Sequence, residues 1–323
     1  MGRQAMRAYG LQTHIWNNQL KSVLLLLGFP VLLMVLWVGI LLVFVGFTEP
    51  VYSYETASTA VIEKFKTTAP YAFLGSLIWF LVAWVLHQRL INLSVGARGL
   101  ERKEAPDLYN LLENLCISRG ITMPKLSIIE SPALNAFASG ISDKNYAITV
   151  TRGLVDTLDD REMEAVLAHE LTHIENQDVR LLIVAVIFVG IFSFVAEALF
   201  EVMFRSGLRV GGQTRSRNGD SRGGGMLIIA GVLLIAIAYA LALVVRFALS
   251  QKREYLADAG AVDLTRDPEA MVSALETISG QSNVEAPSEV KQMMVDNPVR
   301  FMGVFATHPP IRKRIDALRE YAA

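Results

Sequence analysis

Long apolar runs without a charged side chain restrict the fold of this chain more than any other feature. Two lie near the N-terminus, at residues 22–47 and 67–86. A helix needs about 20 apolar residues to cross a hydrocarbon core of ~30 Å, and both runs meet that requirement. Hydrophobic residues make up 52% of the 323-residue chain, more than in an ordinary soluble domain. We therefore expect a membrane protein whose N-terminal part crosses the bilayer twice.

Two further apolar runs follow, at residues 181–196 and 223–245. The first is short for a full crossing. The segment 205–225 between them is rich in glycine and arginine, which favours the cytoplasm by the positive-inside rule. These two runs can therefore form a hairpin that spans the membrane, or a re-entrant hairpin that enters and leaves the membrane on one side. Both interpretations stay open. Glu197 and Glu201 fit the end of an interfacial helix better than buried functional acids.

The basic residues predict the orientation of the first two runs. Arg3, Arg7 and Lys21 precede the first run without any acid, and Arg89 and Arg98 follow the second. Positive flanks stay in the cytoplasm, so we expect both the N-terminus and the polar chain after residue 86 on that side. No small-residue cleavage site follows the first run, so we expect a retained anchor.

Charge and cysteine content argue against a nucleic-acid-binding protein and against a reactive cysteine. The formal net charge is −1 and no extended basic tract is present, so the sequence predicts no nucleic-acid partner. The single cysteine, Cys116, lies in an apolar helical pattern and is expected to be a buried structural thiol rather than a reactive one. The soluble part is expected to lie in a reducing compartment. Nothing in the sequence fixes the oligomeric state.

The polar chain falls into two parts, 93–179 and 251–323, which we expect to form one α+β domain. In the first part, residues 125–129 and 146–150 predict two short strands, and a helix is expected from Asp159 with Glu162 in a capping arrangement. The second part is expected to be wholly helical. The predicted segments are a cytoplasmic tail 1–21, a two-span anchor 22–92, a first domain part 93–179, a membrane hairpin 180–250 and a second domain part 251–323.

The sequence His169-Glu170-Leu171-Thr172-His173 carries the clearest chemistry. Two histidines at i and i+4 lie on one face of a helix, one turn apart, where their nitrogens can bind a Zn²⁺ at ~2.0–2.1 Å. Glu170 flanks that metal and can take a proton from a zinc-bound water and pass it to the leaving amine. The alternative is a surface helix with two histidines by chance, which is improbable in a chain with five histidines.

A catalytic zinc usually has three protein ligands and one open position. Beyond the fourth apolar run, Glu254 and Asp258 share one helical face. Glu254 is the candidate third ligand, and Asp258 is the candidate partner of a ligand histidine's other ring nitrogen. Alone, this pair indicates only a solvated helix face. Together with the two histidines it indicates a zinc site.

The chain resembles the HtpX-type membrane zinc metalloproteases, which are related to the CAAX prenyl proteases and the wider gluzincin group. The resemblance rests on the histidine motif with Asn176 and Asp178 after it, on the REYLAD stretch that contains Glu254, and on the Thr-His-Pro-Pro stretch at 307–310. It implies a gluzincin-like domain with a small sheet, and one zinc per chain held by His169, His173 and Glu254.

The resemblance also implies two less direct roles. In LNAFASG, it indicates that Asn135, Ala136 and Phe137 offer main-chain groups to an extended peptide; from the residues alone, a turn is favoured there. His308 is a candidate donor to the carbonyl oxygen that becomes negative during hydrolysis. Its alternatives are a helix cap for His308 and a donor role for Arg314.

The implied function is a bacterial inner-membrane endopeptidase for protein quality control. It would cut misfolded or damaged membrane proteins on the cytoplasmic side of the lipid bilayer. Three alternatives remain: a CAAX-type prenyl-protein protease, a proteolytically silent zinc-containing membrane module, and a transporter. One distant cysteine argues against a structural zinc site, and the absence of a charged pair midway along the two first runs argues against transport.

Overall fold

The computed structural model describes residues 20, 27–28, 30–49, 53–205, 222–247, 252–285, 288–291, 293–295 and 309–322. The chain divides into two compact units. One is made of residues 23–85 and 185–246, which contain most of the apolar runs. The other is made of residues 1–22, 86–184 and 247–323, which contain most of the polar chain. The fold class is confirmed: the protein is mainly helical, with membrane-type helices and one small sheet.

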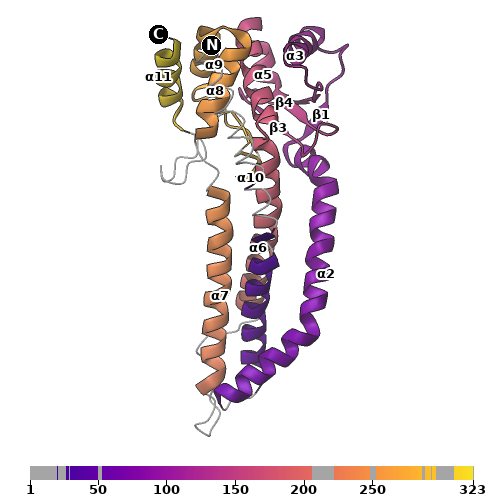
Figure 1. Ribbon diagram of the computed structural model, residues 1–323, viewed down its shortest axis with the longest axis vertical. Coiled ribbons are helices and arrows are strands. Elements are labelled where there is room, and N and C mark those ends of the chain that lie inside the picture. The colour runs from indigo at the N-terminus through magenta and orange to yellow at the C-terminus, as the bar shows by residue number, and fades with distance from the viewer. Residues whose placement is uncertain are drawn as a thin grey trace. The chain divides into compact units, whose positions relative to one another are not determined.

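Three helices of the described chain are long and apolar enough to cross a membrane. They are Pro30–Thr48, α2 (Tyr54–Val95) and the segment Gly224–Ala242 of α7 (Arg222–Phe247). The predicted run 181–196 lies within α6 (Asp178–Arg205), which is not among these three. Figure 1 shows α2, α6 and α7 as single long helices.

The bounds of these helices correct one expectation. The uncharged run 67–86 predicts a second span that begins near residue 67, but α2 begins at Tyr54 and continues through Pro70. The hydroxyls of Thr59 and Thr67 donate to the carbonyls four residues earlier, which gives these polar groups partners within the helix. The middle of the arginine-rich segment 205–225 lies outside the described residues.

Close backbone contact holds two helices of the first unit together. Gly39 lies against Gly231, and Gly46 lies against Gly224. A Cβ atom added to Gly231 would come within 2.6 Å of the carbonyl oxygen of Gly39, closer than any side chain tolerates. Small residues at such crossings let helices pack closely where the surroundings are apolar. This contact joins the helix Pro30–Thr48 to α7.

The second unit contains a four-stranded mixed sheet in the order β1-β2-β4-β3. β1 (Ala97–Gly99) pairs antiparallel with β2 (Lys125–Ile129), and β2 pairs parallel with β4 (Ala147–Thr151). β3 (Ala136–Ser139) pairs antiparallel with β4 and forms one edge of the sheet. The two strands expected from sequence are confirmed as β2 and β4. The turn that the residues alone favoured before β4 is instead the strand β3.

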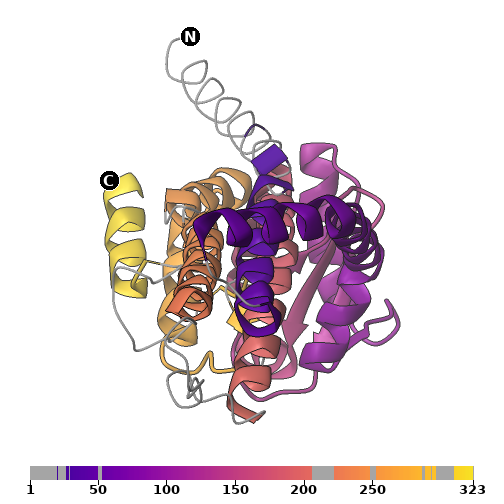
Figure 2. The same ribbon diagram turned by 90° about the horizontal axis from the view of Figure 1, so that it is seen from below.

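Helices surround this sheet, and α5 lies at their centre. The remaining helices of the unit are α3 (Pro106–Arg119), α4 (Arg152–Thr157), α5 (Asp160–Glu175), α8 (Lys252–Thr265), α9 (Pro268–Ile278), α10 (Ser288–Lys291) and α11 (Ile311–Ala322). α5 contacts α3, α8, α9 and β3, and Figures 1 and 2 show α8 and α9 beside it. The helices expected in the C-terminal part are confirmed as α8, α9 and α11, but the expectation that this part is wholly helical is wrong, because residues 279–285 are not helical and Met294 forms a β-bridge.

The start of α5 is fixed as the sequence predicted. The side chain of Asp159 accepts a hydrogen bond from the Glu162 backbone N–H at 2.8 Å, and the Glu162 side chain accepts one from the Asp159 N–H at 3.1 Å. This reciprocal capping box satisfies two backbone donors that have no partner inside the helix.

Cys116 is buried on α3, and burial raises the pKa of its thiol to about 11. The prediction of a structural, unreactive thiol agrees with this.

Candidate metal centre

Helix α5 presents the two motif histidines one turn apart. His169 is fully buried and the side chain of His173 is 13% exposed. Their rings lie at 90° to each other with centroids 4.7 Å apart. The i, i+4 spacing places both side chains on the same face of the helix, as the sequence predicted.

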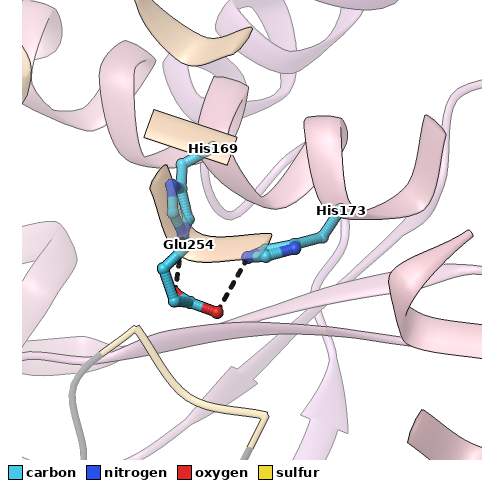
Figure 3. A group of neighbouring side chains, drawn as sticks. All are labelled: His169, His173 and Glu254. Carbon is cyan, nitrogen blue, oxygen red and sulfur yellow. Dashed lines mark ion pairs between the residues drawn. The ribbon is translucent and has the colours of Figure 1, made fainter. Parts of the chain in front are cut away.

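Helix α8 brings the third residue to the same point. Glu254 is 2% exposed, and its two oxygens lie 3.7 Å from Nε2 of His169 and 3.7 Å from Nε2 of His173. One ligand atom from each residue lies within 4.8 Å of the others. Figure 3 shows both rings directed at the Glu254 carboxylate. Ligands of a tetrahedral zinc lie roughly 3.3 Å apart, so this arrangement closes on a metal with small side-chain movements.

A carboxylate holds the second nitrogen of each histidine. Nδ1 of His169 lies 3.0 Å from Oδ1 of Asp258, and Nδ1 of His173 lies 3.0 Å from Oδ2 of Asp178. Such contacts fix the ring orientation, leave Nε2 as the ligand atom and make it a better electron donor. The sequence indicated this role for Asp258. It missed the same role for Asp178, which was noted only as part of the family resemblance.

The charges around the site favour a bound cation. Burial opposes the charged form of His173, but the carboxylates of Glu254 and Asp178 raise its pKa to about 10. The same carboxylates attract a metal ion, which would bind His173 in its neutral form and release this proton. Two imidazole nitrogens and one carboxylate oxygen are also the ligand types of catalytic zinc. The residues present therefore fit zinc.

Glu170 is a buried acid of the site that is not one of the three candidate metal ligands. It is 1% exposed, no side chain in the described part of the chain hydrogen-bonds to its carboxylate, and the backbone of Ala138 favours its ionised form. Burial raises its pKa above the usual value for glutamate. Together with His173, Glu254, Ala138 and Met293 it lines a small cavity. The acid is thus placed to exchange a proton with a group held beside the histidines.

Helix α11 contributes the charge that balances Asp258. The guanidinium of Arg314, fully buried, donates from Nε to Oδ2 of Asp258 at 2.9 Å and from Nη2 to Oδ1 at 2.6 Å. This two-point contact keeps the carboxylate ionised beside His169. The sequence offered Arg314 only as an alternative donor to the reacting carbonyl. The structure shows Nε and Nη2 bonded to Asp258 and Nη1 bonded to the Val295 carbonyl, and the donor role stays a prediction.

The three residues predicted to bind peptide lie at the sheet edge. Asn135 precedes β3; its backbone N–H and C=O bond to Thr151 of β4, so it anchors the strand and does not offer those groups to a peptide. Ala136 and Phe137 lie in β3. On the outer side of β3, Met294 forms a bridge with Phe137, and the Val295 N–H donates to the Ala136 carbonyl at 2.9 Å.

One predicted site residue, His308, lies outside the described residues, as does Thr307. Pro309 and Pro310 follow it and lead directly into α11. The chain therefore connects position 308 to the helix that carries Arg314.

The contact between His173 and Asp178 leads to a prediction. Asp178→Asn removes the charge but keeps the shape, so we expect the zinc affinity of the purified protein to fall by roughly 10- to 100-fold. Competition with a coloured chelator measures that affinity. Asp263→Asn, which changes a partly exposed acid of α8, serves as the control and should leave the affinity unaltered. Equal affinities for the two variants would show that Asp178 does not support the metal ligand.

The chain is similar to known proteins over most of its length. The model of peptidase family M48 matches residues 102–322. A protease HtpX homolog of Bacteroides fragilis is 41% identical over 98% of this chain and 100% of its own length. Protease HtpX homologs of Dictyoglomus thermophilum and Listeria monocytogenes are 40% and 37% identical, over 69% and 67% of this chain and 72% and 74% of their own lengths.

Among solved structures, the crystal structure of S. mikatae Ste24p aligns with a TM-score of 0.48 at 22% identity. The alignment covers 79% of this chain and 60% of that one. The family assignment does not depend on that likeness, because the match to the family model covers more than half of the chain and the relative from Bacteroides fragilis covers nearly all of it. The chain belongs to peptidase family M48 and is a membrane metallopeptidase of the HtpX type.

Proposed function

We propose that this protein is a zinc-dependent endopeptidase that holds one zinc per chain on His169, His173 and Glu254. The observation that carries the proposal is the meeting of these three ligand atoms, from α5 and α8, with a carboxylate behind each histidine. Three protein ligands leave one position of a tetrahedral zinc open, as catalysis requires. A zinc bound there lowers the pKa of a water molecule and polarises the substrate carbonyl.

Glu170 then acts as the general base and acid. Its carboxylate, to which no side chain of the described chain hydrogen-bonds, takes a proton from the attacking water, whose oxygen forms a bond to the peptide carbonyl carbon. When the C–N bond breaks, the same carboxylate returns the proton to the leaving amine. Burial supports both steps, because a raised pKa makes Glu170 a stronger base than an exposed glutamate.

Substrate peptides bind along the outer side of β3. An edge strand supplies main-chain donors and acceptors to an added strand whatever the side chains of the peptide. Ala136 and Phe137 contribute that edge, and Ala138 of the same strand lines the cavity beside Glu170 and His173. A peptide on β3 therefore passes next to the proposed zinc.

His308 is proposed as the donor to the carbonyl oxygen that becomes negative during hydrolysis. Arg314, the competing donor, has Nε and Nη2 bonded to Asp258. His308 stands three residues before α11, next to two prolines that stiffen the backbone.

The proposed substrates are membrane proteins that are misfolded or damaged. Asp178, which contacts His173, is the first residue of α6, and α6 continues into the apolar run 181–196. A site this close in sequence to a membrane segment favours loops of proteins in the same bilayer. The basic flanks Arg89 and Arg98 favour the cytoplasmic face of a bacterial inner membrane. No nucleic-acid partner is proposed.

The role of Glu170 is tested by Glu170→Gln. Glutamine has nearly the same volume and cannot take up the proton, and the zinc ligands are unchanged. We expect full zinc content and peptide hydrolysis lower by at least ~10². Metal analysis and a casein-cleavage assay on detergent-solubilised protein measure both. Loss of zinc would make Glu170 a ligand, and unaltered cleavage would refute the mechanism.

A second prediction concerns His308→Ala. We expect kcat to fall by roughly 10²- to 10³-fold with little change in KM, because the donor acts mainly when charge develops on the oxygen. Zinc content and melting temperature should stay at wild-type values. A variant that loses zinc would identify His308 as a ligand. One that melts early but cleaves normally would identify it as a helix cap.

The topology has its own test. His169 and Glu254 bind one metal, so the chain between them must cross the membrane an even number of times or not at all. Single cysteines placed at the exposed positions Asp160 and Glu269 in a Cys116→Ser background should be labelled from the cytoplasmic side by a reagent that does not cross membranes. Labelling of the two positions from opposite sides would rule out the shared metal site.

A further inference from the structure

Arg253 is a buried cation that neither the metal site nor the proposed mechanism uses. It is 5% exposed and lies in the first turn of α8, directly before Glu254. Its Nε has no hydrogen-bond partner, and its guanidinium forms no ion pair with another described residue. Taking a charged group out of water without giving it a partner is costly, so a residue of this kind indicates a function.

The guanidinium lies at the proposed reaction site. Arg253 lines the same small cavity as Glu170, His173 and Glu254. This cavity therefore contains the proposed base and two of the proposed zinc ligands. A group that enters it lies next to the bond that is cut.

The carboxylates around the cavity do not account for Arg253. Asp178 contacts His173 at 3.0 Å, and the two oxygens of Glu254 contact the two histidines at 3.7 Å. Neither these acids nor Glu170 form an ion pair with the guanidinium, although all three line the same cavity. The N–H groups of Arg253 can therefore bind a group that comes from outside the chain.

A peptide on β3 brings one of its residues to this cavity. Met293 lines the cavity, and two residues further on the N–H of Val295 donates to the Ala136 carbonyl of β3 at 2.9 Å. The proposed function places the substrate on this edge of β3. A bound peptide then replaces this short segment and puts one of its own residues where Met293 lies.

A glutamate in that place offers what methionine lacks. The two side chains are unbranched up to the fourth heavy atom, so glutamate carries a carboxylate oxygen where methionine carries its methyl group. A planar guanidinium binds a carboxylate at two points, and such charge-assisted hydrogen bonds are among the strong ones. Methionine leaves Arg253 without a charged partner, whereas a carboxylate supplies one.

We propose that Arg253 is a specificity-determining residue whose guanidinium binds a carboxylate of the substrate peptide beside the scissile bond. The inference rests on the proposed function. The carboxylate belongs either to an acidic side chain or to the C-terminus of the peptide, and both present the same two oxygens. Because Arg253 and Glu254 are consecutive in one helix, binding this carboxylate fixes the peptide relative to the proposed zinc.

The first test compares matched peptides on the zinc-loaded full chain in detergent. Each peptide contains a site that the protein cleaves in casein, mapped by mass spectrometry, and has an amidated C-terminus. Glutamate or glutamine, which have the same shape, is placed in turn at the residues on either side of the cleaved bond. At one position kcat/KM should be about tenfold higher for glutamate, the effect of a charge-assisted hydrogen bond.

A second pair of peptides separates the two sources of the carboxylate. These peptides end at the residue after the cleaved bond, with either a free carboxylate or an amide. A preference for glutamate in the amidated peptides identifies the side chain as the ligand. A preference for the free C-terminus alone identifies the terminal carboxylate. Absence of both preferences in the wild type would overturn the proposal without any variant.

Arg253→Gln decides whether the preference arises from this residue. The ratio of kcat/KM for the carboxylate and amide peptides should fall to about one. Arg253→Lys should keep part of the ratio, because lysine retains the charge but binds at one point. Arg266→Gln, which changes an exposed arginine just after α8, is the control and should keep the wild-type ratio. Zinc content and melting temperature are measured for each variant.

A role in balancing the charge of the site gives a different pattern. In that case Arg253→Gln slows the cleavage of all peptides equally, and the ratio between carboxylate and amide peptides stays at the wild-type value. That result would overturn the proposal. Should Arg253→Gln fail to fold, Arg253→Lys and the wild-type ratios carry the test, and a ratio unchanged in Arg253→Lys would contradict two-point binding.

Binding separates this inference from the proposed function. Fluorescence anisotropy gives Kd for the labelled glutamate and glutamine peptides in a Glu170→Gln background, which prevents turnover. Kd should be about tenfold lower for glutamate, and the difference should vanish when Arg253→Gln is added. A zinc-loaded wild type that does not cleave casein would refute the function. Cleavage of casein with equal kcat/KM and equal Kd for every matched pair would refute the role of Arg253 alone.

Discussion

The contact of the Glu254 carboxylate with both histidines of α5 is the interaction on which the rest of this structure depends. It joins two helices that the apolar runs separate in sequence, and it brings together three groups that would repel or remain unsatisfied without a cation or protons between them. The surrounding elements hold α5 in position for this contact. The capping box fixes where α5 begins, and α5 packs against α8, α9 and β3.

Buried charge at the site is compensated pair by pair. Asp258 faces Arg314 and the ring of His169, and Asp178 faces His173. Burying a carboxylate without a partner is costly, so each acid that orients a histidine needs its own partner. Glu170 is the exception among the described acids of the site. No side chain of the described chain hydrogen-bonds to its oxygens, which agrees with the proton exchange proposed for it.

Local spacing made much of this predictable from the sequence. The i, i+4 histidines, the Asp159–Glu162 capping box and the strands β2 and β4 follow from patterns within a few residues. Contacts between distant segments leave no such pattern. The arginine at 314 is one of several basic residues in α11, and nothing in its neighbours marks it as the buried one. β3 is four residues long and buried throughout, so no alternation of polar and apolar residues reveals it as a strand.

Zinc K-edge X-ray absorption on the purified full chain tests the central claim most directly, because it reports the metal and its ligand atoms without relying on activity. The account predicts one zinc per chain, with two imidazole nitrogens and carboxylate or water oxygens at about 2.0–2.2 Å, and loss of one oxygen ligand in Glu254→Ala. A sulfur ligand at about 2.3 Å, or a protein that takes up no zinc while correctly folded, would contradict it.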